Sequence, residues 1–220
     1  MASSFHARLE SLPRILPIFP LSGALLLPQG KLPLNIFEPR YLALVEDALA
    51  WGRIFGMIQP SALSSGPKDP PTFDTGCAGR ISSFNETDDG RLMITLTGVC
   101  RFRVGEEVEG IRGYRRVAAN WAPYADDLDE SPAIEVNRGR LLTVLKPFLK
   151  LHNMDLNWKA LEAASDLALT VSLAMACPFE PREKQALLEA ADPTDRAETL
   201  IALMEMAVAD GNGGKGHVRQ

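Results

Sequence analysis

The sequence predicts an α+β fold, in which a β-rich amino-terminal part precedes a helical carboxy-terminal part. Apolar and polar residues alternate along residues 92–104, as in strands with one buried face. Beyond residue 133, apolar residues recur at the helical spacings of three and four. Between the two parts, residues 122–133 carry four acidic side chains between two prolines, which predicts a solvated linker. We expect a β subdomain with one helix at 14–121, the acidic linker at 122–133, a helical subdomain at 134–209 and a disordered tail at 210–220.

Short apolar segments separated by turn residues predict a barrel or a sandwich for the first part. Asp88-Asp89-Gly90 has the composition of a turn between two strands. The apolar run at 15–27 is interrupted by Pro17 and Pro20 and is too short to span a membrane, so we interpret it as two buried strands rather than a signal peptide. The expected strands are 14–19, 24–27, 54–59, 79–84, 92–97, 100–104 and 114–121.

Residues 38–51 are the one helix predicted within the β part. Pro39 suits its first turn, where the missing N–H costs nothing. Apolar residues at spacings of three and four give the helix one apolar stripe. Gly52 follows where a left-handed cap would end it.

Residues 60–72 are predicted to form a long loop rich in proline and serine. Two interpretations are open. The loop is either a mobile functional flap that forms one wall of a binding groove or a loop without regular structure, and the composition slightly favours the second.

The second part is predicted to contain four helices. Asn157 can cap the second helix, and Pro147 is expected to kink or break the first. The expected helices are 134–151, 157–177, one that starts at 181 and one that starts at 193.

Composition excludes several classes of protein. The chain has 220 residues, of which 46% are hydrophobic and 23% charged, values typical of a folded soluble protein. The net charge is −5, and no dense basic region is present, so nucleic acid is not an expected partner. The three cysteines form no CxxC motif and the three histidines are far apart, so we expect no metal and no cofactor. Reduced cysteines and the absence of an apolar stretch of membrane-spanning length predict a cytoplasmic protein with no membrane partner.

No motif in the sequence predicts catalysis. The glycine-rich stretch at 213–216 lacks the first glycine, the Ser or Thr after lysine and the following helix of a phosphate-binding loop. Neither a GxSxG elbow nor an HExxH motif occurs. We therefore name no catalytic residue and do not expect an enzyme.

The most distinctive segment is residues 36–41, around the predicted helix start. Phe37, Glu38, Arg40 and Tyr41 are the candidate substrate-binding residues, because the helix start would present them together. A structural role is favoured over this one: Glu38 would stabilise the helix dipole and pair with Arg40, while Phe37 and Tyr41 would pin the helix to the sheet.

Arg112, Tyr114, Arg115 and Arg116 form the one basic and aromatic cluster of the sequence. Such a cluster could stack on single-stranded nucleic acid. Arginines on the outer face of an edge strand are the commoner explanation.

Several segments together resemble the N-terminal, substrate-binding domain of the Lon ATP-dependent proteases. The most specific are residues 16–21 (LPIFPL) and 32–41 (LPLNIFEPRY). Residues 79–81 (GRI), 98–104 and 183–189 (EKQALLE) support them. The resemblance covers residues 14–208.

The resemblance implies a β-barrel of the PUA-like type followed by a helical bundle, and a domain of bacterial type. It implies unfolded or partly folded polypeptides as partners, and a Lon-type protease as a candidate partner. The AAA+ ATPase and Ser-Lys peptidase modules are absent, so kinship with the S16 peptidases implies no activity. We expect a non-catalytic polypeptide-binding module that acts as an adaptor in protein quality control. Because PUA-like barrels also occur in RNA-modifying proteins, an RNA-binding module is the alternative, and a hydrolase with a site assembled only in three dimensions is a third class.

Overall fold

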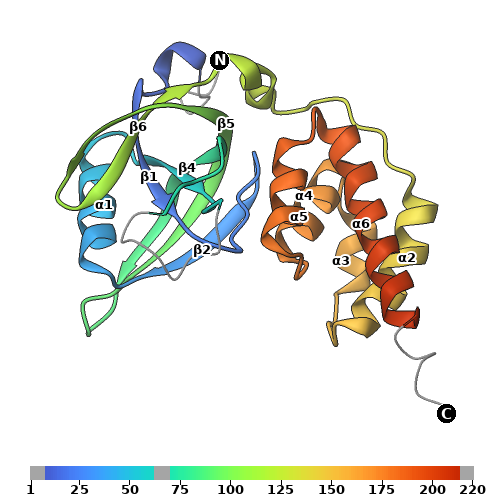
Figure 1. Ribbon diagram of the computed structural model, residues 1–220. Helices are drawn as coiled ribbons and strands as arrows, with labels where there is room; N and C mark the ends of the chain where they lie inside the picture. The colour runs from blue at the N-terminus through green and yellow to red at the C-terminus, as the bar shows by residue number, and fades with distance from the viewer. Residues whose placement is uncertain (1–7, 62–69, 214–220) are drawn as a thin grey trace. The chain divides into compact units, whose positions relative to one another are not determined.

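A computed structural model describes residues 8–61 and 70–213 of the chain, so most of the predicted loop at 60–72 lies outside the described residues. The chain divides into two units, Met1–Pro132 and Ala133–Gln220. All strands of the described residues belong to the first unit, and the second is helical (Figure 1). The predicted α+β fold, with a β-barrel first and helices second, is confirmed.

The six strands of the described residues form one sheet in the order β2-β5-β4-β3-β1-β6. Because β5 also pairs with β6, the sheet closes into a barrel. Neighbouring strands are antiparallel, except that β1 and β3 are parallel. The strands are β1 (Ile15–Pro20), β2 (Lys31–Ile36), β3 (Ile54–Ile58), β4 (Thr75–Glu86), β5 (Leu92–Ile111) and β6 (Tyr114–Asn120).

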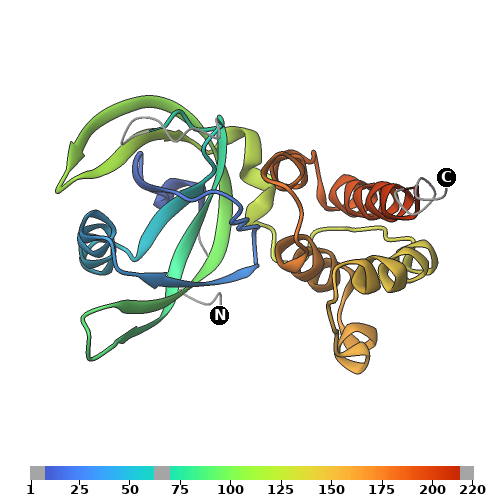
Figure 2. The same cartoon turned by 60° about the horizontal axis from the view of Figure 1, so that its bottom comes forward.

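Strand β5 takes part in two different pairings. Its residues 92–97 pair with β2, and its residues 103–111 pair with β6, so the strand curves around the barrel (Figure 2). The sequence predicted two strands here, but the chain continues through a register shift against β4 instead of ending. A Cβ atom on Gly98 would lie 2.0 Å from the carbonyl oxygen of Leu27, so only glycine fits at this point.

Two differences from the prediction concern the segment before the first helix. Residues 24–27 form no strand, although residues 25–27 are buried. Pro28 follows them and has no N–H to donate to a ladder. The ladder resumes with β2, which was not predicted because Pro33 occupies its middle. As the end strand of the sheet, β2 tolerates a proline.

Apolar side chains from five strands fill the barrel. Its core cluster contains Leu16, Ile18, Phe102 and Val117, all at most 1% exposed. The predicted helix is present as α1 (Pro39–Ala50), which lies on the outside of the barrel (Figure 2).

The segment predicted as a solvated linker starts with a 3-10 helix that is packed onto the barrel. This helix, η2 (Ala122–Leu128), contacts β5. Asp127 forms a buried ion pair with Arg101 of β5, which also lies 4.5 Å from the ring centroid of Tyr124. The prediction of a solvated segment was wrong at Asp127, because an acidic residue becomes a tertiary contact when a buried arginine faces it. A short 3-10 helix η1 (Leu9–Ser11) precedes β1.

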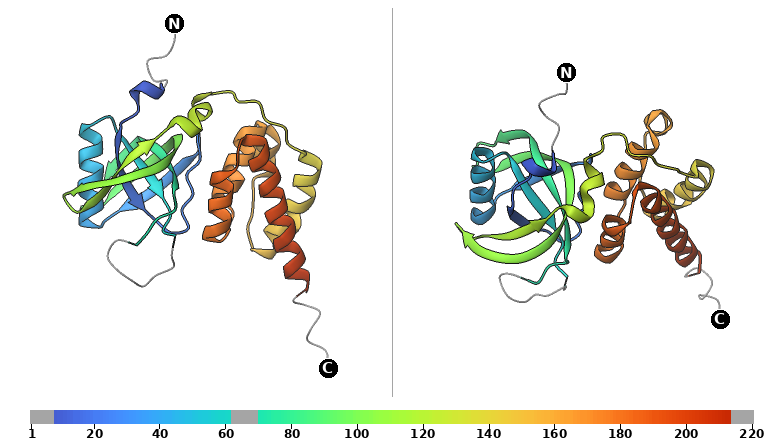
Figure 3. Two further views of the ribbon diagram at one scale, coloured as in Figure 1. Left: turned by 45° about the horizontal axis from the view of Figure 1, so that its top comes forward. Right: turned by 90° about the horizontal axis from the view of Figure 1, so that it is seen from above.

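The second unit contains five helices among its described residues, and α6 is the longest of them (Figure 3). Arg140 of α2 joins this helix to α6 through ion pairs with Glu198 and Glu205. No helix in the described part of the chain is both long and apolar enough to cross a membrane. The helices are α2 (Arg138–Leu151), α3 (Trp158–Ala163), α4 (Asp166–Ala176), α5 (Pro181–Glu189) and α6 (Pro193–Gly213).

Three helical predictions differ from the structure. The helix expected at 157–177 is two helices, because the Ser165 hydroxyl accepts a hydrogen bond from Ala168 N–H (3.3 Å) and starts α4 anew. Pro147, which was expected to kink or break its helix, lies inside α2 and does not break it. Residues 210–213, expected in the disordered tail, belong to α6, whereas 214–220 lie outside the described residues.

Candidate functional site

Three of the four predicted binding residues contact one another at the start of α1. Glu38 precedes the helix, and its carbonyl accepts hydrogen bonds from the N–H groups of Tyr41 and Leu42 at 2.9 Å. Arg40 donates from Nε to Glu38 Oε2 at 3.2 Å, and its guanidinium lies 4.5 Å from the Tyr41 ring centroid. The predicted pairing of Glu38 with Arg40 is confirmed.

Phe37 does not pin the helix to the sheet as predicted. Its side chain is 64% exposed. Tyr41 alone performs this role: it is buried, and its ring centroid lies 3.9 Å from that of Phe19 on β1. An apolar residue just before a helix need not face the sheet, because its direction depends on the turn that leads into the helix.

A groove lies at the other end of α1. Strand β1 places Ile15, Pro17 and Phe19 on one face, because side chains alternate along a strand. Tyr41 covers Phe19, but the same face stays open beyond the carboxy-terminal end of α1, and Ile15 is 40% exposed. A cavity of about 470 Å³ lies there, between β1, the end of α1 and the β5–β6 hairpin. We call this cavity the α1 groove.

Large apolar side chains stand at the edge of the α1 groove. Trp51, the residue after α1, is 82% exposed, and Ile111 at the end of β5 is 41% exposed. Gly52 (φ 85°) then turns the chain away. Exposed apolar groups around a concave surface mark a place where another molecule can exclude water. No motif predicted this groove, because its residues come from three distant parts of the sequence.

The predicted basic cluster borders the α1 groove but is largely neutralised. Arg112 donates to Asp47 at 2.8 Å and to Glu46 at 2.6 Å, and Arg115 donates to Glu107 at 2.7 Å. Strand β6 pairs with both β1 and β5, so the arginines do not lie on the edge strand that was predicted.

Two further groups of the cluster face internal acceptors. Arg116 donates to the carbonyl oxygen of Glu109 at 2.9 Å. The Tyr114 hydroxyl donates to Asp47 at 2.8 Å, and burial together with this carboxylate raises the pKa of Tyr114 to about 12. The cluster therefore supports the fold of the β5–β6 hairpin.

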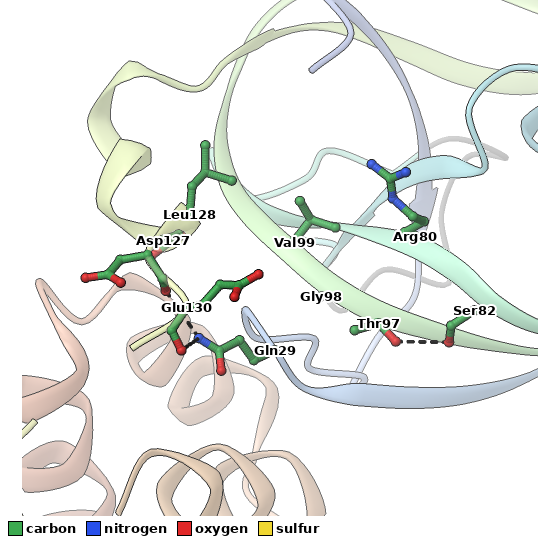
Figure 4. Close-up of a pocket in the computed structure, with 10 residues that line it drawn as sticks. Gln29, Arg80, Ser82, Thr97, Gly98, Val99, Asp127, Leu128 and Glu130 are labelled. Carbon is green, nitrogen blue, oxygen red and sulfur yellow. Dashed lines mark hydrogen bonds between the residues drawn. The ribbon is translucent and has the colours of Figure 1, made fainter. Parts of the chain in front are cut away.

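A second cavity of about 550 Å³ opens at one end of the barrel (Figure 4). Val99 and Leu128, which line it, also pack against the barrel core. We call it the barrel-mouth cavity. Its other lining residues come from β4, β5, the loop before β2, and η2 with the residues that follow it.

The loop before β2 forms a closely fitted wall of the barrel-mouth cavity. Gln29 has φ 64°, a left-handed conformation that is uncommon for residues other than glycine. Its N–H donates to the Gly98 carbonyl at 2.9 Å, and its side-chain amide donates to the carbonyls of Asp129 and Glu130, both at 3.3 Å. These bonds hold the loop, β5 and the segment after η2 together.

Nothing in the described part of the chain provides a metal centre, since no group of three His, Cys, Asp or Glu residues is placed to hold an ion. The three cysteines are buried thiols. Burial raises the pKa of Cys100 and of Cys177 to about 12, so both stay protonated at neutral pH.

The sequence matches a family model described as the ATP-dependent protease La (LON) substrate-binding domain over residues 15–206. Lon protease 2 of Myxococcus xanthus is 27% identical over 200 residues, which cover 89% of this chain and 24% of that protein. Lon protease 3 of Sorangium cellulosum is 27% identical over 205 residues, which cover 88% and 24%. The chain thus spans about a quarter of the length of these curated relatives.

Solved structures share this fold. The crystal structure of a Lon N-terminal domain protein from Xanthomonas campestris aligns with a TM-score of 0.58 and 28% identity, and covers 86% of this chain and 97% of that one. The N-terminal domain of a Mycobacterium avium complex Lon protease aligns with a TM-score of 0.54 and 17% identity, and covers 87% and 98%.

Proposed function

Because the chain belongs to the ATP-dependent protease La (LON) substrate-binding domain family, we propose that it is a non-catalytic module that binds unfolded or partly folded polypeptides. The observation that carries this proposal is the α1 groove, where Ile15, Trp51 and Ile111 expose apolar surface around a concave site. Unfolded chains expose apolar side chains, and burying one of these against the groove contributes about 1.5–3 kcal/mol.

Laying an apolar segment in the groove is favoured over adding a strand to the sheet. The end strand that could accept another strand is β2. Its Pro33 offers no N–H, and Lys31 places a charge on the same strand. Proline and lysine are the residues with which proteins block strand addition at a sheet edge.

In this proposal the segment that starts α1 provides a second contact surface, at the end of the helix opposite to the α1 groove. Phe37 offers its exposed ring to a substrate. Glu38 and Arg40 retain partly exposed charged groups beside it. Tyr41 is a positioning residue, because it is buried against Phe19 and holds α1 in place.

The proposal includes a role as an adaptor for a Lon-type protease, which membership of the family supports. Binding should be transient, with a Kd of the order of 1 μM, or about −8 kcal/mol. RNA binding is the alternative outcome. The ion pairs of Arg112 and Arg115 weigh against it, because RNA would have to compete with their internal carboxylates.

The test is a fluorescence anisotropy titration of the full chain with a reduced, carboxymethylated and labelled protein that cannot refold. The Trp51→Ala variant should raise the Kd by about tenfold or more. Trp158→Ala is the matched control, since Trp158 is a partly exposed tryptophan in the other unit. Equal binding of the polypeptide by wild type and Trp51→Ala would refute the proposal that the α1 groove is the binding site. Salt-sensitive binding of single-stranded RNA without polypeptide binding would favour the alternative, an RNA-binding module.

A further inference from the structure

Arg116 places a positive charge beside the apolar surface of the α1 groove. Strand β6 pairs Arg116 with Pro17 of β1, so the two side chains leave the sheet on the same face. Both residues line the groove. Trp51 and Ile111 stand at its edge and are 82% and 41% exposed. The groove therefore joins a cationic group to exposed apolar surface within one concave site.

The charge of Arg116 is not offset by an internal carboxylate. Its Nε donates to the carbonyl oxygen of Glu109 at 2.9 Å, and its Nη2 donates to the same atom. Arginine carries further N–H donors. Within residues 8–61 and 70–213, those of Arg116 have no acceptor, and no carboxylate forms an ion pair with it. A half-buried guanidinium that binds only a neutral carbonyl favours an anionic partner from outside the chain.

The other charged groups of the groove already have partners. Of the described lining residues, Asp47 is the one with a carboxylate. Its Oδ1 accepts a hydrogen bond from Arg112 and its Oδ2 accepts one from the Tyr114 hydroxyl, both at 2.8 Å. Arg112 also binds Glu46, which does not line the groove, at 2.6 Å. An incoming cation would have to compete for Asp47, whereas an incoming carboxylate would find the remaining donors of Arg116.

This combination discriminates between polypeptide segments. A purely apolar segment would cover Trp51 and Ile111 but would remove water from Arg116 without supplying a counter-charge, which is costly. A segment with lysine or arginine would bring a like charge towards Arg116. A segment in which aspartate or glutamate stands among large apolar residues avoids both costs.

From this arrangement we infer that the α1 groove selects unfolded segments in which an acidic residue is flanked by large apolar residues. The acidic carboxylate pairs with Arg116, and the apolar side chains cover Trp51 and Ile111. The inference rests on the proposed function, because it specifies which polypeptides the same groove binds. It concerns side-chain carboxylates, since an unfolded chain has many of these and a single carboxyl end.

The experiment is a fluorescence anisotropy titration of the full chain with three peptides that carry the same dye and have blocked ends. The peptides share leucine and phenylalanine residues around one variable position, which holds glutamate, glutamine or lysine. The proteins are wild type, Arg116→Gln and Arg116→Lys. Arg103→Gln is the matched control, because it alters an exposed arginine of β5 outside the groove.

Melting temperatures check that each variant is folded. This control matters because Arg116 also binds the Glu109 carbonyl. Lysine at this position retains a positive charge and an N–H donor for that carbonyl, so Arg116→Lys keeps the test open if Arg116→Gln does not fold.

Wild type should bind the glutamate peptide about tenfold more tightly than the glutamine peptide, a difference of 1.4 kcal/mol, and the lysine peptide most weakly. Arg116→Gln should remove the difference between glutamate and glutamine. Arg116→Lys should keep part of it, because an ammonium group retains the charge but not the planar fork of donors. Arg103→Gln should keep all of it. Trp51→Ala should weaken every peptide and leave their ratios unchanged.

Equal binding of the glutamate and glutamine peptides by wild type would overturn the inference and leave the proposed function standing. A preference for glutamate that persists in folded Arg116→Gln would also overturn it, because another group would then recognise the carboxylate. Binding of none of the peptides would overturn the inference, and the proposed function falls with it if the unfolded protein also fails to bind.

Discussion

The Arg101 guanidinium and the Asp127 carboxylate form a two-pronged ion pair, with Nη2–Oδ1 and Nε–Oδ2 distances of 2.8 and 2.9 Å. Their side chains are 4% and 9% exposed. The Asp127 carboxylate also accepts the Arg101 backbone N–H at 2.9 Å. One aspartate of η2 therefore accepts hydrogen bonds from both the side chain and the backbone N–H of Arg101 in the long strand β5.

Replacing Asp127 with alanine should lower the free energy of unfolding by about 3 kcal/mol, because it leaves a buried guanidinium without its counter-charge. Urea denaturation followed by circular dichroism measures this value. Asp126→Ala, at an exposed neighbouring residue, should change it by less than about 0.5 kcal/mol. The double variant Arg101→Met, Asp127→Leu should recover most of the loss, and equal effects of the two single aspartate variants would contradict this account.

Tyr114 should titrate late, with a pKa of about 12. Burial and the hydrogen bond to Asp47 both favour its protonated form. Because the folded state binds this proton more tightly than the unfolded state, the contribution to stability is complete below pH 10 and is lost as the pH rises to about 12. The difference in phenolate absorbance between wild type and Tyr114→Phe gives the pKa. Asp47→Asn should lower the pKa of Tyr114. An unchanged pKa in this variant would show that Asp47 does not influence the titration of Tyr114.

Arg40→Ala should destabilise the chain by no more than about 1 kcal/mol. Its pair with Glu38 is partly exposed, so solvent screens most of the Coulomb attraction, and the contact with the Tyr41 ring adds a similar small amount. Thermal unfolding measures the cost. A loss of polypeptide binding with an unchanged melting temperature would support Arg40 as a contact residue of the proposed binding surface, whereas a loss of stability well above about 1 kcal/mol would contradict the prediction.

The purified chain should neither hydrolyse ATP nor cleave casein above a buffer blank. The reason is chemical: the sequence lacks a phosphate-binding loop, and the buried Cys100 and Cys177 are protonated thiols rather than nucleophiles. Phosphate release and fluorescent casein assays measure both activities. Activity that stays with the protein through successive columns and scales with its concentration would contradict the prediction.

Local patterns were sufficient to predict most elements of the fold. The alternation along residues 92–104, the proline at the start of α1 and the turn at Asp88-Asp89-Gly90 each act within a few residues, and the structure confirms them. Strand β2 was missed because its Pro33 is acceptable only at the end of a sheet, which is a tertiary property. The start of α4 at Ser165 was missed because the helical spacing of apolar residues continues on both sides of this cap, so the pattern alone predicts one helix.

The candidate sites could be predicted less well than the fold. Segment 36–41 was found because its residues are adjacent in sequence. The α1 groove and the barrel-mouth cavity are assembled from distant segments, and Trp51 has no local signal that sets it apart from an ordinary surface residue. The assignment of Phe37 to the interface with the sheet failed because hydrophobicity alone does not specify the direction of a side chain.

The pairing of β1 with β6 has a consequence for how the chain is made. Ile15 pairs with Ala118, so the first strand can complete its hydrogen bonds only after more than a hundred further residues have been added. Contacts this distant in sequence slow folding, because the chain entropy is lost before the contacts form. During synthesis the first unit must therefore stay open until β6 has left the ribosome, and its apolar strands are exposed to chaperones and proteases throughout that interval.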